Sequence, residues 1–115
     1  MNDDFLDYIE DILDAMNKAE ILLEGVSYEQ FAADFRINFA VVRALEIVGE
    51  ATKRLPMSLR DSYPEIPWRN MAGMRDRITH GYDSINLRIV WDVVKVDNPE
   101  LKPQIRKILE DYSDE

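Results

Sequence analysis

Apolar residues recur at steps of three and four positions between residues 3 and 23, and this spacing constrains the fold more than any other feature of the sequence. Such spacing is typical of an amphipathic helix that buries one face. The residues of this stripe are Phe5, Tyr8, Ile9, Ile12, Leu13, Met16, Ala19 and Leu23. Gly25 follows the stripe and is a common helix stop. We therefore expect the chain to open with one long helix.

A second helical stretch is predicted to begin after Ser27, which forms a capping-box pattern with Gln30 three positions later. The stretch can bend near Asp34 and runs to Leu55, before Pro56. Its predicted core side comprises Ile37, Val41, Ala44, Leu45, Val48 and Ala51.

Gly49 lies inside this second stretch, where glycine costs roughly 1 kcal/mol relative to alanine. A glycine at such a position indicates that another backbone approaches closely. The approach is either across a dimer interface or within one chain. Glu50, beside it, is either a cleft residue or simply exposed.

Prolines are frequent between residues 56 and 67, so we expect a connecting loop there, with one short helical turn around residues 58 to 61. Pro67 is a suitable first residue for a third helix, which is predicted to end near Gly81.

Asn86 can cap a fourth helix, and Asn98 opens a last one in which Pro103 should produce a kink or delay the helix. No alternating pattern predicts a strand longer than a few residues. The expected fold is therefore all-α: an antiparallel bundle of about five helices, forming a single domain over residues 1 to 115.

The composition narrows the class of protein. The hydrophobic fraction of 46% is ordinary for a globular chain, and no stretch approaches the roughly 20 apolar residues that a membrane span needs. The acidic N-terminus does not resemble a secretory signal, so we expect a cytoplasmic protein without membrane contact.

The sequence has no cysteine and one histidine, His80, which excludes thiolate sites and a two-histidine metal site within one chain. We expect no metal and no cofactor.

The net charge of -9 argues at first against binding to nucleic acid, because such binding depends on Lys and Arg contacts with phosphates. The distribution weakens this objection. Residues 51 to 97 contain 6 acidic and 8 basic residues, a local charge of +2, so the middle of the chain can face an anion.

The densest polar cluster of the sequence lies in this basic region, between residues 73 and 82. On a helix, Asp76 and His80 would stand about 40° apart, so the carboxylate could hydrogen-bond the imidazole and orient it. Arg75 and His80 would diverge by about 140°. They can converge on one ligand only if the helix frays or a second copy contributes.

Metal-free cleavage of RNA needs a base for the 2′-hydroxyl, an acid for the departing 5′-oxygen and a cation for the charge that grows on phosphorus. One imidazole cannot easily do all of this. A two-fold homodimer with facing motif helices would supply two copies of His80 and of Arg75.

A structural interpretation of the same residues is equally open on the bare pattern. A lone histidine near a helix end is commonly a surface residue or a partner of the helix dipole. Arg75 and Arg77 are more often solvated or ion-paired than catalytic, and Tyr82 is more often a core or boundary residue than a modified one.

The motif formed by Arg75, His80 and Tyr82 resembles the signature of the HepT-like branch of the HEPN proteins, which is Arg, four residues, His, one residue, Tyr. Residues 45–51, 63–68 and 71–75 are also similar to that family, in the same order. The resemblance covers roughly residues 3 to 110. It implies a homodimeric, metal-independent RNase toxin paired with a minimal nucleotidyltransferase antitoxin of the MntA kind.

The resemblance also implies roles for individual residues. Arg75 and His80 would be catalytic, Asp76 would orient His80, and Tyr82 would accept AMP from the antitoxin. Glu50 and Arg77 are candidate cleft residues. The alternative is a non-catalytic nucleotide-binding or adaptor module that binds a nucleotidyltransferase partner.

Overall fold

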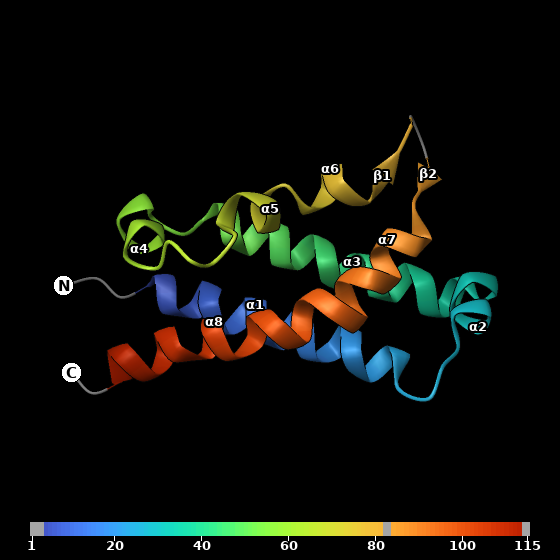
Figure 1. Ribbon diagram of the computed structural model, residues 1–115, viewed down its shortest axis with the longest axis horizontal. Helices are drawn as coiled ribbons and strands as arrows, with labels where there is room; N and C mark the ends of the chain where they lie inside the picture. The colour runs from blue at the N-terminus through green and yellow to red at the C-terminus, as the bar shows by residue number, and fades with distance from the viewer. Residues whose placement is uncertain (1–3, 82–83, 114–115) are drawn as a thin grey trace.

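The computed structural model describes residues 4–81 and 84–113, and over these residues the predicted all-α class is confirmed. Helix α1 (Phe5–Leu23) and helix α3 (Phe35–Lys53) form the longest pair, with α3 running back along α1 (Figure 1). Helix α8 (Asn98–Ser113) packs beside α1, and the start of α1 and the end of α8 lie at the same end of the molecule (Figure 1).

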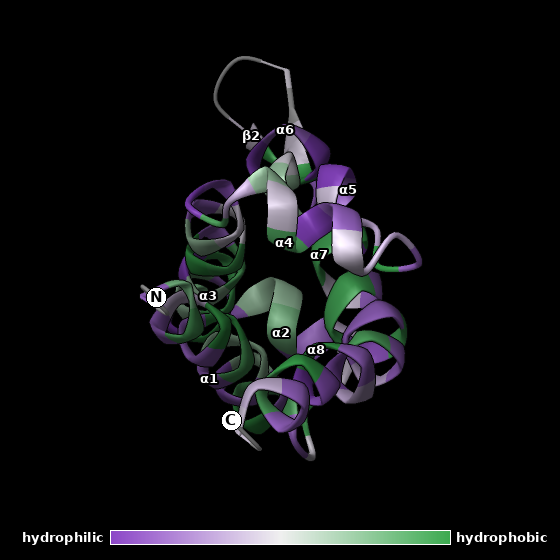
Figure 2. Ribbon diagram, turned by 90° about the vertical axis from the view of Figure 1, so that its left-hand side faces the viewer, coloured by the Kyte–Doolittle hydropathy of each residue, from purple (hydrophilic) through white to green (hydrophobic). Residues whose placement is uncertain are grey.

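The core follows the predicted stripes. On α1 the predicted residues from Ile9 to Leu23 are buried, and Gly25 ends the turn with a φ of 72°. On α3, Val41, Leu45 and Val48 are fully buried. Viewed end-on, the hydrophobic sides of α1 and α3 turn toward the interior (Figure 2).

The predicted second stretch is divided into two helices at Asp34. Helix α2 (Tyr28–Ala33) begins with the predicted capping box, in which the backbone N–H of Gln30 donates to Ser27 Oγ at 3.1 Å. Asp34 then caps α3, because its carboxylate accepts from the backbone N–H of Arg36 at 3.0 Å. The helical stretch is therefore interrupted at Asp34, where the sequence indicated a bend, and the Asp34 side chain caps the helix that follows.

The segment between α3 and the motif contains α4 (Met57–Ser62), at the predicted helical turn, and α5 (Trp68–Ala72). Helix α6 (Met74–Ile78) follows after Gly73. The prediction of one continuous third helix ending near Gly81 is therefore wrong: the helix is interrupted at Gly73 and ends at Ile78.

Gly49 allows α5 and α6 to lie against α3. A Cβ atom at this position would be 3.2 Å from the backbone oxygen of Met71 and 3.2 Å from Cβ of Met74. Of the two alternatives left open by the sequence, the structure therefore shows the close approach within the chain.

A short antiparallel ladder follows α6. Strand β1 (Thr79–His80) pairs with β2 (Ser84–Ile85), with Thr79 opposite Ile85 and His80 opposite Ser84. The N–H of Asn86 donates to the oxygen of Ile78 at 2.7 Å and closes the ladder next to the helix. Two-residue strands are too short to leave an alternating pattern in a sequence.

Helical structure continues without a loop from α7 (Leu87–Asp92) through the π turn η1 (Val93–Asp97) into α8. The sequence predicted two separate helices here, and Pro103 lies inside α8 rather than delaying its start. The N–H of Asn98 reaches back five residues to the oxygen of Val93. None of the described helices is long and apolar enough to span a membrane.

Candidate functional site

The motif residues lie where the chain changes from helix to strand. Arg75 is on α6, whereas His80 is on β1, because Thr79 adopts an extended conformation with φ -86° and ψ 137°. The Thr79 hydroxyl donates to the backbone oxygen of Arg75 at 2.6 Å and satisfies a carbonyl at the helix end. The helix therefore ends between Arg75 and His80, which is one of the two conditions under which they can converge.

The helical argument for pairing Asp76 with His80 does not hold. It required a regular helix through residue 80, and α6 ends two residues earlier. The side chain of His80 is not among the described features, and Tyr82 lies outside the described residues. The orienting role of Asp76 and the acceptor role of Tyr82 therefore stay predictions.

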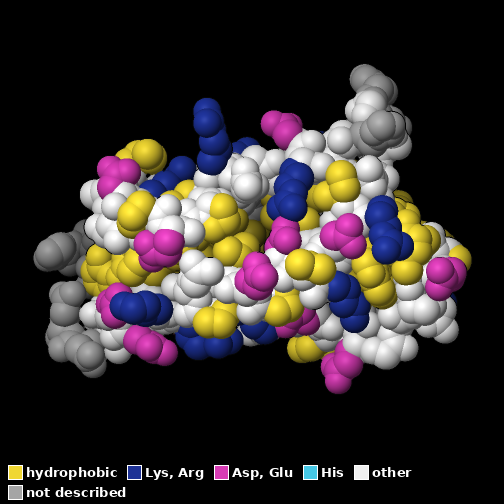
Figure 3. All heavy atoms as spheres, viewed as in Figure 1, with side chains coloured by type: hydrophobic (Ala, Val, Ile, Leu, Met, Phe, Trp, Pro, Cys, Tyr) yellow, Lys and Arg dark blue, Asp and Glu magenta, His cyan; other side chains and the backbone are white. Residues whose placement is uncertain are grey.

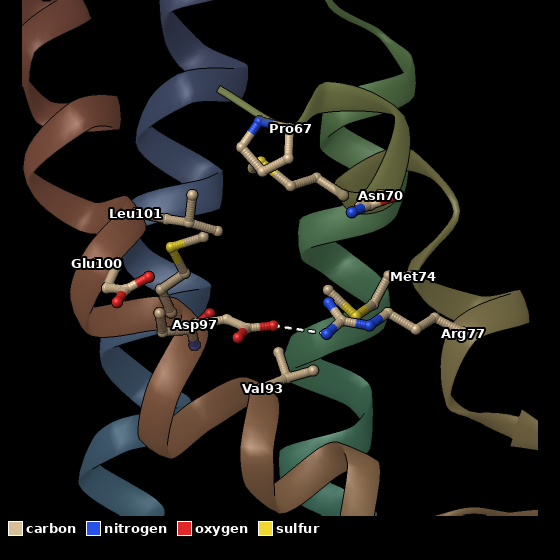
Figure 4. Close-up of a pocket in the computed structure, with 11 residues that line it drawn as sticks. Pro67, Asn70, Met74, Arg77, Val93, Asp97, Glu100 and Leu101 are labelled. Atoms are coloured by element: carbon tan, nitrogen blue, oxygen red, sulfur yellow. Dashed lines mark ion pairs between the residues drawn. The ribbon is translucent and has the colours of Figure 1, made fainter. Parts of the chain in front are cut away.

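The two arginines of α6 have different surroundings. Arg77 forms an ion pair with Asp97 of η1, with 2.7 Å between Nη2 and Oδ2 (Figure 4). Arg75 is exposed and its guanidinium has no ion pair with any residue of the described parts. Arg77 thus holds two elements together, while Arg75 is the arginine that can take a phosphate bidentately.

Glu50 is exposed on α3 and pairs with Arg43 at 3.0 Å. Arg43 also lies 3.7 Å from Glu46. The structure therefore places this candidate cleft residue in a charge cluster along α3, and not in an ion pair with a described residue of α6. Within residues 4–81 and 84–113, no three side chains of the types that bind metals gather in one place.

The sequence reasoning missed an apolar groove beside the motif hairpin. Phe39, Val42, Ile85 and Leu87 form its apolar lining, so it runs from α3 to β2 and α7. The rings of Phe35 and Phe39 are in contact, with 5.9 Å between their centroids. Two phenylalanines four residues apart on the otherwise polar side of a helix were the signal for this surface.

The surface charge is mixed near these elements. Figure 3 shows basic and acidic side chains interspersed over one face of the molecule, with hydrophobic groups between them. Such a face does not attract a polyanion through one broad basic field. Binding of a phosphate would instead depend on individual groups such as Arg75.

Comparison with known proteins agrees with the motif. Residues 12–108 match the family model described as ribonuclease HepT-like. A protein of Thermococcus cleftensis named probable ribonuclease HepT is 44% identical over 102 residues, which are 89% of this chain and 93% of that protein. A candidate RNase of Caldanaerobacter subterraneus subsp. tengcongensis is 42% identical over 106 residues, 90% of this chain and 92% of that protein.

No solved structure matches the chain significantly. The assignment therefore depends on the sequence comparisons, which extend over α1, α3, the motif and α8 and align nearly the whole length of the relatives. The resemblance predicted from the motif is confirmed, and the chain belongs to the HepT-like ribonuclease family.

Proposed function

We propose that this protein is a metal-independent endoribonuclease toxin whose active cleft is formed by two copies of the chain. The observation that carries the proposal is the position of Arg75. It is exposed, lacks an ion pair with any described residue, and lies five residues before His80 across the end of α6. An arginine so placed can hold the scissile phosphate beside an imidazole.

The chemistry assigns a role to each group. A base removes the proton of the 2′-hydroxyl, the 2′-oxygen attacks phosphorus, and the bond from phosphorus to the 5′-oxygen breaks. An acid protonates that departing oxygen, so the products are a 2′,3′-cyclic phosphate and a 5′-hydroxyl. Because each chain has one histidine, a second His80 from the partner copy supplies the second proton-transfer group.

The apolar groove supports pairing of two chains next to the motif. Phe39 is 72% exposed and Ile85, on the motif hairpin, is 38% exposed. Large exposed apolar side chains that gather in one place are typical of surfaces that a partner covers. A second copy seated on this groove would lie beside the hairpin that carries His80.

The proposed switch is the transfer of AMP to Tyr82 by a minimal nucleotidyltransferase of the MntA kind. Tyr82 is two residues from His80 in the sequence. An AMP group on this residue would add negative charge and bulk to the motif and would repel an RNA backbone. No change of fold is needed. Family membership supports this pairing, and the test is an AMP-sized mass increase that Tyr82→Phe abolishes.

Cleavage of a labelled tRNA pool in the presence of EDTA tests the main proposal. The wild-type chain is compared with His80→Ala, Arg75→Gln and, as a matched control, Arg69→Gln, an exposed arginine of α5 outside the motif. We expect the wild-type chain to cleave the RNA and to leave 2′,3′-cyclic phosphate ends. The cleavage rate of His80→Ala should be at least about a hundredfold lower, and that of the Arg69→Gln control should equal that of the wild type.

Two outcomes would contradict the proposal. Equal cleavage by wild-type and His80→Ala protein would assign the activity to another site or to a contaminant. No cleavage of any RNA by the wild-type chain would favour the adaptor alternative, in which the protein binds a nucleotidyltransferase without cutting.

A further inference from the structure

The hairpin that carries His80 needs support from outside its own strands. Strand β1 follows directly after α6 and β2 leads into α7, so the two strands project from the molecule between these helices (Figure 1). Between its described residues the ladder contains two residue pairs. An isolated two-stranded ladder is at best marginally stable in water. The position of the hairpin relative to α6 therefore depends on contacts outside the ladder.

Asn86 makes one hydrogen bond to each of the two helices that flank the hairpin. Its backbone N–H donates to the oxygen of Ile78, the last residue of α6, at 2.7 Å. Its side-chain Oδ1 accepts from the backbone N–H of Ile89 at 3.1 Å and so caps α7. These two hydrogen bonds, the Asn86 clamp, tie the end of the motif helix to the start of the next helix.

Both partners of Asn86 are groups that a helix end leaves open. The oxygen of Ile78 is in the last turn of α6, and the N–H of Ile89 is in the first turn of α7, so neither has a partner in the regular pattern of its own helix. Asn86 is half-buried and extended, with φ -82° and ψ 94°. Because a side-chain cap requires such an extended residue, the bond to Ile89 also holds the Asn86 N–H in the direction of α6.

The clamp lies at the base of the hairpin. Strand β1 begins directly after Ile78 and β2 ends directly before Asn86, so the bond between these two residues joins both ends of the hairpin. A catalytic group has to be held closely in place, since a displacement of about 1 Å can lower a rate a hundredfold.

From this arrangement we infer that Asn86 is a positioning residue, which holds the hairpin of His80 at a fixed place relative to Arg75 on α6. Its effect on cleavage rests on the proposed function. The clamp itself can be measured without RNA.

The neighbours of Asn86 also belong to the surface proposed for the second copy. Ile85 and Leu87 line the apolar groove beside the motif hairpin. Loss of the clamp would therefore loosen this surface together with the hairpin. For this reason the cleavage rates are compared at protein concentrations at which sedimentation shows every variant to be dimeric.

Two substitutions at position 86 isolate the side-chain acceptor. Asn86→Ala removes it, whereas Asn86→Ser keeps a neutral acceptor of the kind that helix N-caps prefer. Ser27→Ala is the matched control, because it removes the cap of α2 outside the motif. Helix α2 has six residues, as α7 has, and its cap bond is also 3.1 Å long.

Amide hydrogen exchange of the full-length chain, followed by NMR, measures the clamp directly. We expect the N–H of residue 86 to exchange at least about tenfold faster in Asn86→Ala than in the wild type, after correction for the intrinsic rate of each sequence. The same N–H should keep its wild-type exchange rate in Asn86→Ser and in Ser27→Ala.

The kinetic constants of RNA cleavage separate positioning from stability. We expect kcat of Asn86→Ala to be at least about tenfold lower with little change in KM, because the proton-transfer group is displaced while Arg75 stays on α6. In Asn86→Ser and Ser27→Ala, kcat should equal that of the wild type. A merely structural role would lower the urea midpoint in both alanine variants and leave kcat of the folded protein unchanged in both.

Two results would overturn the inference. Equal exchange at residue 86 in the wild type and Asn86→Ala would show that the side chain does not hold the N–H. Faster exchange with an unchanged kcat would show that the clamp does not position the reacting group. If Asn86→Ala does not fold, Asn86→Gly takes its place, because glycine also lacks the acceptor but is tolerated at an N-cap.

Failure of the proposed function has a different result. A wild-type chain that cuts no RNA would contradict that function, and the exchange rates would still decide whether Asn86 holds the hairpin.

Discussion

The guanidinium of Arg77 lies 2.7 Å from the carboxylate of Asp97, and this ion pair joins the motif helix α6 to the π turn η1. The two side chains are 40% and 29% exposed, so solvent screens much of their attraction. We expect Arg77→Gln and Asp97→Asn each to lower the free energy of unfolding by no more than about 1 kcal/mol. A double-mutant cycle measured by urea unfolding should give a coupling energy of a few tenths of a kcal/mol, up to about 1 kcal/mol.

Arg75→Gln is the matched control for this cycle, because Arg75 is on the same helix but has no ion pair with a described residue. Its free energy of unfolding should equal that of the wild type within about 0.5 kcal/mol. Equal stability losses for the Arg75 and Arg77 variants would mean that the pair with Asp97 does not tie the two elements together.

The long helices could be predicted because each buries a continuous stripe. The spacing from Ile9 to Leu23 marked the buried side of α1, and the capping box at Ser27 marked the start of α2. These are local signals, in which residues three or four positions apart already determine which side is buried. The motif at Arg75 and His80 was found in another way, from the density of polar residues between positions 73 and 82 and from its resemblance to a family signature.

The details of the site could not be predicted, because they depend on contacts between distant segments. Nothing near Arg77 in the sequence indicates Asp97, 20 residues later. The π turn that brings Asp97 into place adds one residue per turn and leaves no clear periodic signal in five residues. The end of α6 at Ile78 likewise depends on pairing of β1 with β2, which is too short to be recognised.

Substitution of Gly49 tests the close contact that positions the motif. Alanine gains helix propensity of roughly 1 kcal/mol, but its Cβ would press on the backbone of α5 and on Cβ of Met74, both at 3.2 Å. Because neither neighbour is the flexible end of a side chain, we expect overpacking to outweigh the propensity. Gly49→Ala should be less stable than wild type by about 1 kcal/mol, and Gly49→Val by more.

Denaturant unfolding and RNA cleavage are both informative for this series. We expect the rate of RNA cleavage to fall along with the free energy of unfolding. The added side chain would push α6, which carries Arg75, away from α3. A fully stable Gly49→Val protein would show that α3 and the segment containing α5 and α6 are not in close contact.

A hydrogen bond between Tyr63 and Asp111 predicts a pH dependence of stability. The Tyr63 hydroxyl donates to Asp111 Oδ2 at 2.7 Å. This hydrogen bond, together with the ammonium of Lys107, holds the pKa of Asp111 below its ordinary value of 3.8. In the window just below that value the unfolded chain binds the proton first, so the free energy of unfolding falls as pH decreases. The contribution is complete above about pH 4 and is lost below it.

Tyr63→Phe removes the largest cause of the lowered pKa of Asp111, so its stability should depend less steeply on pH between about pH 2 and pH 4 than that of the wild type. The measurement is the urea midpoint across this range. Tyr112→Phe is the control. The Tyr112 and Phe5 rings pack in a T-shaped arrangement with 5.2 Å between their centroids, and the Tyr112 hydroxyl makes no hydrogen bond to a described residue that the substitution would remove. Identical acid profiles for Tyr63→Phe and the wild type would contradict this account.

A substitution in the groove between α3 and the motif hairpin tests whether two chains form the active cleft. A carboxylate at position 39 would replace a 72% exposed phenylalanine, whose ring contacts Phe35, and would be costly to bury under a second copy. We expect Phe39→Glu to raise the dimer dissociation constant at least about tenfold in analytical ultracentrifugation, with little change in monomer stability because the site is exposed. Ile21→Glu, at a 65% exposed position on α1, is the matched control.

The rate of RNA cleavage should depend on the fraction of the protein that is dimeric. If two copies of His80 serve one phosphodiester, the Phe39→Glu variant loses activity at concentrations where it is monomeric and regains activity at higher concentration, whereas Ile21→Glu behaves as the wild type. Activity per chain that does not change with concentration, in a protein shown to be monomeric, would instead require one chain to supply both proton transfers. Since each chain has one histidine, a residue other than His80 would then have to serve as the second acid or base.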